Sequence, residues 1–402
     1  MRAKRKSLPA LALAGILGLT IGLPAGAETM KQPADDIEIE NIAKFSNPWA
    51  LAFLPDGKLL ATEKLGNLYI FADGKMSSPI EGVPKVEYKD QGGLLDVAVD
   101  PDFANNKFVY LSYSERAEQQ PADAKEEKDE RLGDYQDLSD TVLKGLAVAR
   151  GRLEGDRLED VQVIWRQVPK TIGRGHFGGR LVFAPDGKLF ITSGDRQRFE
   201  PAQDMASNLG KVVRINPDGS IPDDNPFVGQ DGTLPEIWTL GHRNELGAAI
   251  NPASGELWIH EMGPKGGDEV NIVVRGKNYG WPQVSQGAHY DDQPIPDHKT
   301  KPEFATPAYS WDPSISPAGL IFYTGDKFPA WKGKALLGGL SSEALIVLTL
   351  DGDKVVSDEI IEMGRRIRDV AQAPDGTVLL LVDGESGGDL LRLTPKGEAR
   401  SG

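Results

Sequence analysis

Short apolar segments separated by a tight turn recur along the chain. Each copy has an apolar strand, a Pro-Asp-Gly or similar turn, and a second apolar strand. Close copies occupy residues 49–60, 181–190 and 370–379, and looser copies occupy 97–102, 249–255 and, less distinctly, 321–326. Proline presets the φ angle of a turn and glycine supplies a positive φ, so each copy predicts a β-hairpin.

The hairpins are numerous and spaced like the units of a repeat fold. Their turns are centred near positions 55, 101, 185, 252, 326 and 374. Strands repeating at intervals of this size indicate the blades of a propeller. We therefore predict an all-β, six-bladed β-propeller, with an array of β-sandwiches as the alternative. No part of the sequence is typical of a second fold, so residues 28–402 are expected to form a single domain.

The N-terminal segment has a different pattern. Four of the first six residues are basic, residues 11–23 are apolar, and Ala25-Gly26-Ala27 has the small side chains that a signal peptidase requires. We predict that residues 1–27 are a signal peptide, removed on export to the periplasm or beyond. An uncleaved membrane anchor is the alternative, but the apolar run is short and lies between Pro9 and Pro24.

One interval between hairpins contains an acidic stretch. Residues 114–140 hold ten acidic and four basic side chains and few apolar ones. This composition predicts a solvated insertion between strands, and a partner-docking segment is the alternative.

Charge and cysteine content narrow the class of protein. The net charge of -15 disfavours nucleic acid and anionic membranes as partners. The absence of cysteine excludes disulfides, a thiolate nucleophile and a thiolate zinc site. No stretch after the signal peptide is long and apolar enough to span a membrane. A soluble exported protein is expected, whose oligomeric state the sequence does not give.

A glycine-rich segment contains the first candidate for chemistry. His176 lies in the sequence Gly-Arg-Gly-His-Phe-Gly-Gly-Arg, residues 173–180. Flanking glycines allow the backbone to approach a ligand closely. A neutral imidazole there could accept a proton from a substrate hydroxyl, so His176 is a candidate general base. The alternative is a structural histidine that caps a turn.

Two segments present arginines. Arg243 and Asn244 form a pair suited to an anionic or carbonyl-rich ligand, although a salt bridge between blades explains the arginine equally well. Arg366 and Arg368 would project from the same face of a strand. Two adjacent guanidiniums repel each other unless an anion neutralises them. That anion is either a ligand carboxylate or phosphate, or a carboxylate of the protein such as Asp369.

A fourth segment is rich in oxygen ligands. Residues 260–271 and 278–282 combine carboxylates, amides and backbone carbonyls next to glycines. These are groups that calcium binds, although the spacing is not that of an EF-hand. The alternative is an acidic surface loop.

Together these segments resemble the soluble aldose sugar dehydrogenases that depend on pyrroloquinoline quinone (PQQ), the glucose/sorbosone dehydrogenase family. The resemblance extends from about Asn47 to Pro395, excluding the acidic insertion. It depends on the motifs His-Phe-Gly-Gly-Arg-Leu, Gly-Pro-x-Gly-Gly-Asp-Glu-x-Asn-Ile, Gly-Lys-Asn-Tyr-Gly-Trp-Pro and Arg-Ile-Arg-Asp-Val. The family fold is a six-bladed propeller, in agreement with the number of hairpins.

The resemblance implies specific roles. His176 matches the general base that takes the sugar hydroxyl proton while hydride passes to the quinone, and Arg243 matches the residue that stabilises charge on the reduced cofactor. The other implied cofactor contacts are Gln91, Asn244, Tyr290, Gly339, Leu340, Ser341, Arg366, Ile367 and Arg368. The implied calcium ligands are the backbone carbonyls of Gly263 and Pro264, and, in a further site, Glu269 and the Tyr279 carbonyl. The implied cofactors are thus PQQ and Ca²⁺, and the implied substrate is an aldose that is oxidised to its lactone.

This sequence departs from the family pattern at three places. Ser341 stands where members usually carry a lysine against the cofactor. Glu245 and Leu246 replace a Pro-Gln pair, and Arg196 displaces a substrate-side glutamine to Gln197. These changes affect the expected substrate and cofactor affinity more than the reaction type.

Two other functions fit a six-bladed propeller. A calcium-dependent lactonase or esterase would need several side-chain oxygens converging on one ion. A sugar- or protein-binding propeller would need neither His176 nor the arginine pair. The sequence does not identify the sugar or the natural electron acceptor.

Overall fold

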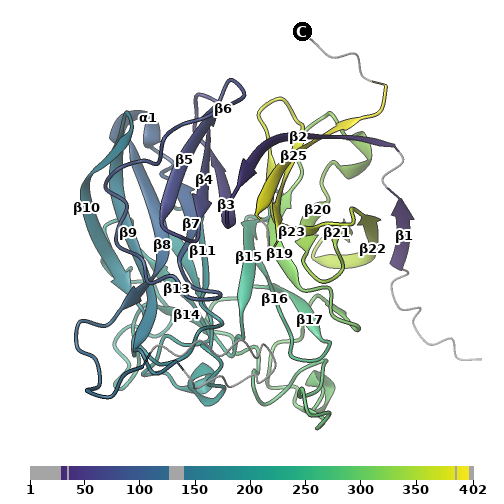
Figure 1. The fold of residues 1–402 in the computed structure, drawn as a ribbon. Coiled ribbons are helices and arrows are strands. Elements are labelled where there is room, and N and C mark those ends of the chain that lie inside the picture. Colours follow the sequence, from purple (N-terminus) through teal and green to yellow (C-terminus); the bar gives the residue numbers. More distant parts are fainter. Residues whose placement is uncertain (1–28, 34–35, 126–139, 385–386, 398–402) are drawn as a thin grey trace, which may run out of the picture.

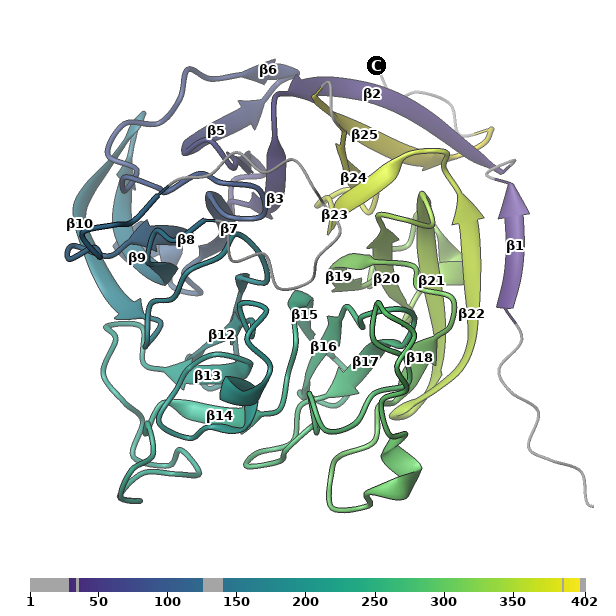
Figure 2. The same cartoon turned by 60° about the horizontal axis from the view of Figure 1, so that its bottom comes forward.

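The computed structural model describes residues 29–33, 36–125, 140–384 and 387–397. The described chain is almost entirely strand, arranged as six sheets around a central axis (Figures 1 and 2). The only α-helix among these residues is α1 (Phe103–Asn106), with short 3₁₀ turns η1 (Glu200–Gln203), η2 (His298–Thr300) and η3 (Pro329–Trp331). The predicted signal peptide and residues 126–139 of the acidic stretch lie outside the described residues.

Each sheet is one blade, and each blade is built on four antiparallel strands. The first three blades are β3 (Pro48–Phe53), β4 (Leu59–Glu63), β5 (Asn67–Ala72) and β6 (Lys75–Met76); β7 (Leu94–Val99), β8 (Phe108–Arg116), β9 (Lys144–Glu154) and β10 (Arg157–Arg166); and β11 (Gly178–Phe183), β12 (Leu189–Ser193), β13 (Lys211–Ile215) and β14 (Ile237–Leu240).

The next two blades follow in chain order. They are β15 (Glu245–Ile250), β16 (Leu257–Glu261), β17 (Asp268–Ile272) and β18 (Tyr309–Trp311); and β19 (Pro317–Phe322), β20 (Ala335–Gly339), β21 (Ala344–Asp351) and β22 (Lys354–Glu362). Strand β1 (Thr29–Pro33) adds to the outer edge of this fifth blade, parallel to β22.

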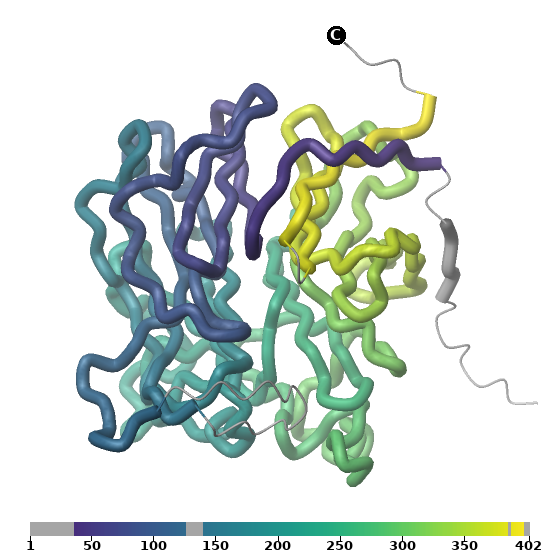
Figure 3. Tube along the Cα trace, viewed as in Figure 1, coloured from purple at the N-terminus to yellow at the C-terminus, as the bar shows by residue number. Residues whose placement is uncertain are grey.

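The sixth blade joins the two ends of the chain. It contains β23 (Arg366–Gln372), β24 (Val378–Asp383) and β25 (Gly388–Pro395), and its outer strand is β2 (Ile37–Phe45). Figure 3 shows this purple segment beside the yellow C-terminal strand. The antiparallel pairing of β2 with β25 closes the ring, because an N-terminal strand completes the blade formed by the C-terminal strands. The pairing also covers the outer edge of β25, which would otherwise be open. The six-bladed β-propeller prediction is confirmed, and the β-sandwich alternative is wrong.

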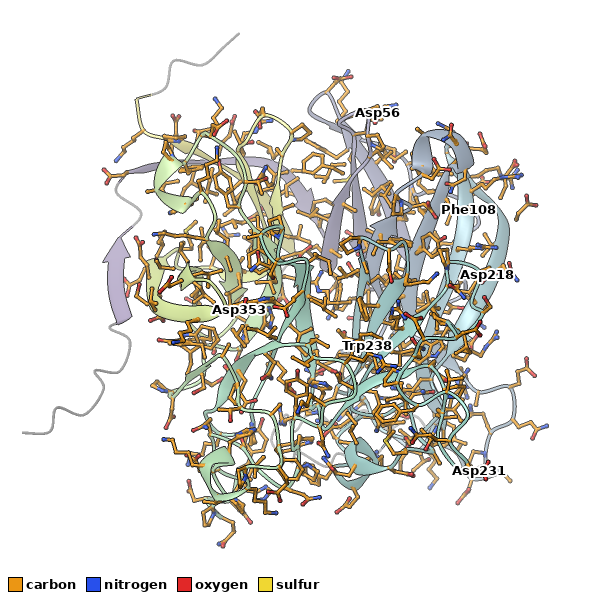
Figure 4. All side chains as sticks on the ribbon, turned by 180° about the vertical axis from the view of Figure 1, so that it is seen from behind. Asp56, Phe108, Asp218, Asp231, Trp238 and Asp353 are labelled. Carbon is orange, nitrogen blue, oxygen red and sulfur yellow. The ribbon has the colours of Figure 1, made fainter. Side chains whose placement is uncertain are left out.

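All six predicted turns connect the first and second strand of a blade. Gly57, Gly187 and Gly376 have φ values of 86°, 78° and 83°, as the Pro-Asp-Gly turns require. Asp56, in the first of these turns, lies at the top of the molecule in Figure 4. The turns therefore lie at one end of the ring, and the first strand of every blade begins at the other end.

The innermost strands β3, β7, β11, β15, β19 and β23 contact one another around the whole axis. Each carries one extra residue close to its start, in the irregularities at 48–51, 94–97, 178–181, 245–247, 318–321 and 367–369. A bulge of this kind bends the strand and redirects a side chain. Six bulges at one level therefore turn side chains toward the axis near the end where the strands begin.

Buried side chains join neighbouring blades at these bulges. Thr62 donates to the Leu95 carbonyl (2.6 Å), Ser112 to that of Gly179 (2.5 Å), Thr192 to that of Glu245 (3.1 Å), and the His260 Nε2–H to that of Gly319 (2.8 Å). Each bond runs from the second strand of one blade to the first strand of the next. These bonds satisfy carbonyls that the bulges remove from the sheet ladders.

Candidate active site

A cavity of about 240 Å³ opens on the axis where the innermost strands begin. Five of the predicted cofactor contacts line it: Gln91, Asn244, Leu340, Arg366 and Arg368. They come from the second, fourth, fifth and sixth blades. The fold thus brings together residues that are as much as 277 positions apart in the sequence.

His176 lies beside this cavity in a strained backbone conformation. Its φ is 50°, its side chain is almost fully buried, and its N–H donates to Gln91 Oε1 at 2.9 Å. A Cβ on Gly194 would lie 2.4 Å from the His176 carbonyl, so only glycine fits there. The glycine-rich sequence therefore holds the histidine in place, as well as allowing close approach to a ligand.

A buried carboxylate orients the imidazole. His176 Nδ1 lies 2.7 Å from Asp195 Oδ1, and Asp195 Oδ2 accepts from the Trp281 indole N–H at 2.7 Å. An ionised carboxylate only accepts, so the Nδ1 atom carries the proton. The neutral imidazole then presents Nε2 as its basic atom, to which no described residue is hydrogen-bonded. This is the arrangement expected of a general base and its orienting group.

The surroundings keep this pair in the required charge states. Burial, followed by the positive charge of Arg243, lowers the pKa of His176 below its usual value of 6.5. Burial raises the pKa of Asp195, but His176, Arg243 and the Gln197 N–H outweigh it and hold the pKa of that carboxyl below its usual range. At neutral pH the histidine is therefore uncharged and the aspartate ionised.

Arg243 is fixed between the cavity and the segment 260–271. Its Nη1 donates to the carbonyls of Met262 and Gly263, at 2.8 and 2.9 Å, and its guanidinium lies over the Trp281 ring. Its Nη2 lies 3.4 Å from the hydroxyl of Tyr290, whose side chain is 46% exposed. The buried Nε has no partner among the described residues. Among the described residues Arg243 forms no salt bridge, so the alternative explanation of this arginine, a salt bridge between blades, is not supported.

Within the described part of the chain, the arginine pair Arg366 and Arg368 has a single carboxylate partner, Asp383. Arg368 Nε donates to Asp383 Oδ2 at 2.8 Å, and Arg366 Nε lies 3.6 Å from Asp383 Oδ1. The alternative partner, Asp369, instead pairs with Arg180 at 3.0 Å. The two guanidiniums therefore leave net positive charge on the cavity wall. Between them, Ile367 is fully buried in the core and does not line the cavity.

The predicted contacts at 339–341 are divided. Leu340 lines the cavity and its carbonyl accepts from Arg366 Nη1 at 3.3 Å. Gly339 ends β20, where a Cβ would collide with the Ser342 hydroxyl. The Ser341 hydroxyl bonds to Ser316 Oγ at 2.9 Å and does not line the cavity.

A second, smaller cavity of about 20 Å³ lies under Arg243. Three of the predicted metal ligands, Gly263, Glu269 and Tyr279, line it, and Pro264 does not. Its size suits one ion or water molecule. The Gly263 carbonyl already accepts from Arg243, and the Tyr279 carbonyl accepts from His298 Nε2 at 3.1 Å. Each carbonyl oxygen retains a second lone pair.

Glu269 is the charged group of this smaller cavity. Its side chain is buried and accepts a hydrogen bond from the Asn271 amide at 3.4 Å. Burial, followed by the neighbouring Glu261, raises the pKa of Glu269 well above its usual value. A cation would reverse this effect, and the donor set fits calcium. Within the described ranges no group of three or more histidine, aspartate or glutamate side chains is arranged around one point.

Several residues of the site were missed from the sequence. Trp281 lies in the motif Gly-Lys-Asn-Tyr-Gly-Trp-Pro, and Asp195 directly precedes Arg196, but nothing local in the sequence indicated that these two residues meet. Arg196, seen only as a displacement, donates to the carbonyls of Gly173, Lys144 and Gly175 and lies over the Phe177 ring. It therefore anchors the loop that carries His176.

Comparisons with known proteins identify the family of this chain. The family model described as "Glucose / Sorbosone dehydrogenase" matches residues 45–392. The chain belongs to the glucose/sorbosone dehydrogenase family. It is 43% identical over 361 residues to the aldose sugar dehydrogenase YliI of Escherichia coli (strain K12), covering 88% of this chain and 91% of the relative.

One further relative and one solved structure extend the comparison. The quinoprotein glucose dehydrogenase B of Acinetobacter calcoaceticus is 27% identical over 425 residues, covering 86% of this chain and 85% of the relative. The crystal structure of the soluble aldose sugar dehydrogenase of Escherichia coli, in its apo-form, superposes with a TM-score of 0.80 at 40% identity. That match covers 90% of this chain and all of the other. No helix in the described ranges has the length and hydrophobicity needed to cross a membrane.

Proposed function

We propose that this protein oxidises aldose sugars to lactones with PQQ as the redox cofactor and calcium as a bound ion. The observation that carries the proposal is His176, with Nδ1 held by buried Asp195 and Nε2 free of described partners beside a cavity with positive walls. The names of its relatives, an aldose sugar dehydrogenase and a quinoprotein glucose dehydrogenase, support the same reaction.

The cavity residues fit a planar, polyanionic quinone. Arg366 and Arg368 would hold its carboxylates, because the single carboxylate of Asp383 leaves them under-neutralised. Asn244, Gln91 and Tyr290 would position its polar edge, with Leu340 packing against the ring system. The bound quinone supplies the acceptor for hydride.

The protein supplies the proton transfer and its electrostatics. His176 Nε2 would accept the proton of the sugar hydroxyl, which makes hydride departure from the same carbon easier. Asp195 would stabilise the imidazolium that results, and Trp281 would keep the aspartate in position. Arg243 lies where its guanidinium would meet negative charge that develops in the cavity.

Calcium would occupy the smaller cavity next to Arg243. Glu269 would be its charged ligand, with the carbonyls of Gly263 and Tyr279 completing the set and Pro264 contributing from the adjacent backbone. The ion would stabilise the loop 260–271, whose carbonyls hold the Arg243 guanidinium.

We further propose that residues 1–27 direct export to the periplasm and that residues 28–402 act as a single domain. Secretion can be tested by locating the full-length chain in cell fractions and determining the N-terminal residue of the mature protein. Cleavage after Ala27 is the expected result, and an intact N-terminus in the cytoplasmic fraction would contradict it.

The central test uses the purified apoprotein with PQQ and calcium. Addition of an aldose should reduce an artificial electron-acceptor dye, and the His176→Ala variant should bind PQQ yet lose about 100- to 10,000-fold in kcat. Absence of turnover over a panel of aldoses, together with no PQQ binding, would reject the function. Lactone hydrolysis in the same preparation would favour the lactonase alternative. No observation on the described residues supports that alternative.

A further inference from the structure

A third cation lines the same cavity and comes from the first blade, which is next to the blade of the arginine strand. Lys64 directly follows β4 in the first blade, and its side chain is among those that form the cavity wall. Its backbone is fixed between blades: its N–H donates to Asn47 O and its carbonyl accepts from Leu94 N, both at 2.9 Å. A Cβ on Gly93 would lie 2.2 Å from the Lys64 carbonyl, so glycine is required there. The lysine is therefore held in a defined place.

Lys64 has no carboxylate partner within ion-pair distance among the described residues. Its Nζ donates to the backbone carbonyl of Asp90 at 3.1 Å and lies 5.8 Å from the centre of the Tyr88 ring. The Asp90 carboxylate itself pairs with Arg174 at 2.9 Å. The Lys64 ammonium group therefore retains N–H donors that a ligand can use.

The charges around the cavity do not balance. Lys64, Arg366 and Arg368 bring three positive charges to the cavity wall. The carboxylates near them are Asp90, which lines the cavity and pairs with Arg174, and Asp383, which pairs with the two arginines, so cations remain in excess. Burial, followed by the repulsion from Arg368, lowers the pKa of Lys64. Such a cluster is costly in the empty cavity, and an anion with several charges removes that cost. Ser341, by contrast, uses its hydroxyl on Ser316 and offers no charge.

We propose that Lys64 is a third cationic contact for the polyanionic cofactor, beside Arg366 and Arg368, and provides the positive charge that Ser341 does not. This inference rests on the proposed function. It differs from that function in assigning a cofactor-binding role to a residue of the first blade. Lys64 then binds the cofactor and takes no part in proton transfer.

The test measures PQQ binding directly, by quenching of intrinsic tryptophan fluorescence and by equilibrium dialysis with calcium present. Lys64→Met should weaken PQQ binding roughly 10- to 100-fold, the value of a charge-assisted hydrogen bond. Its dissociation constant should also depend less on salt concentration, because one cation is lost. Lys64→Arg should retain most of the affinity. The matched control is Lys58→Met, an exposed lysine paired with Asp56 at the other end of the ring.

A lysine introduced at position 341 gives an independent test. Lys64→Met combined with Ser341→Lys should recover at least part of the lost affinity, since the second lysine restores the charge. Equal PQQ affinity and equal salt dependence in the parent and in Lys64→Met would overturn the assignment of Lys64 and leave the proposed function intact. No PQQ binding by the folded parent or by any variant would overturn the proposed function itself, and this inference with it.

Discussion

Replacing Asp195 with asparagine removes one negative charge beside His176 and leaves the side-chain volume almost unchanged. Three donors converge on the aspartate: His176 Nδ1 and the Gln197 N–H on Oδ1, and the Trp281 indole N–H on Oδ2. An amide can accept on only one side. Its oxygen will face His176, where it satisfies two donors, and its NH₂ group will then face the indole N–H.

The size of the effect follows from this geometry. A hydrogen bond to an ionised group contributes about 1–2 kcal/mol more than a neutral one, so stabilisation of the imidazolium falls by about 5- to 30-fold. We expect kcat to fall by about 10- to 100-fold, including the loss of the Trp281 contact. If the amide turned its NH₂ group to His176, Nε2 would carry the proton and the loss would approach 10,000-fold. KM should change little, because Asp195 is fully buried and does not line the cavity.

The pH profile separates this role from a structural one. Burial lowers the pKa of His176, and Asp195 partly opposes that effect. Removing the aspartate charge should therefore move the acidic limb of kcat/KM, already below pH 6.5, further toward acid. The control is Asp96→Asn, a buried aspartate that pairs with Arg180 and lines another cavity. A variant at 195 with unchanged kcat and an unchanged acidic limb, but a lower melting temperature, would refute the orienting role.

Three further predictions concern stability. Thr192→Val should lower the free energy of unfolding in urea by about 2–4 kcal/mol, because it removes an acceptor shared by two bulge N–H groups and a donor to the next blade. Thr349→Val, on the third strand of the fifth blade and away from the bulges, should cost under about 1 kcal/mol. Glu245→Gln should raise the melting temperature at pH 8, and this increase should become smaller as the pH is lowered toward 4. The reason is that burial raises the pKa of Glu245, whose carboxylate oxygens have no hydrogen-bond partner among the described residues. The parent therefore loses stability as pH rises past 4.5. A difference in melting temperature between parent and variant that does not change with pH would contradict this. A calcium chelator should lower the melting temperature of the parent by several degrees and that of Glu269→Gln much less, and equal shifts would argue against this ligand.

The blade hairpins were predictable because their signal is local. Pro-Asp-Gly between two apolar runs specifies a turn within four residues, and three such turns with three looser copies gave the number of blades. The closure of the ring was not predictable in the same way. Strand β2 pairs with β25 across almost the whole chain, and residues 37–45 carry no turn motif that marks them as the outer strand of the last blade. The bulges were also missed, because a single extra residue in a strand becomes visible only against its partner.

The candidate site was predictable where a residue violates a local rule. His176 lies among glycines, and Arg366 and Arg368 repeat the same charge on one face of a strand. Asp195 and Trp281 violate no such rule, and their meeting depends on loops from the third and fourth blades. Lys64 follows a glutamate at the end of an ordinary strand, and only the closed ring brings it to the arginine pair. The proposed roles of these residues, the signal peptide and the extent of the domain stay predictions.

The central axis has a barrier that decides from which end the site is reached. The guanidinium of Arg180 lies 4.3 Å from the centre of the Trp49 ring, donates to the Leu246 carbonyl, and pairs with Asp96 and Asp369. Trp49 and Leu246 line the candidate active-site cavity, whereas Arg180 and both aspartates line a separate cavity on the side of the hairpin turns.

These side chains come from the bulges of five different blades, so the six displaced residues near the strand starts explain the barrier as well as the cavity. A buried guanidinium that satisfies two carboxylates and a carbonyl costs several kcal/mol to dislodge. This contact therefore separates the candidate active-site cavity from the cavity on the turn side. Under the proposed function, cofactor and sugar would therefore enter from the loop end, where the bound cofactor would form the floor on which the sugar meets Nε2.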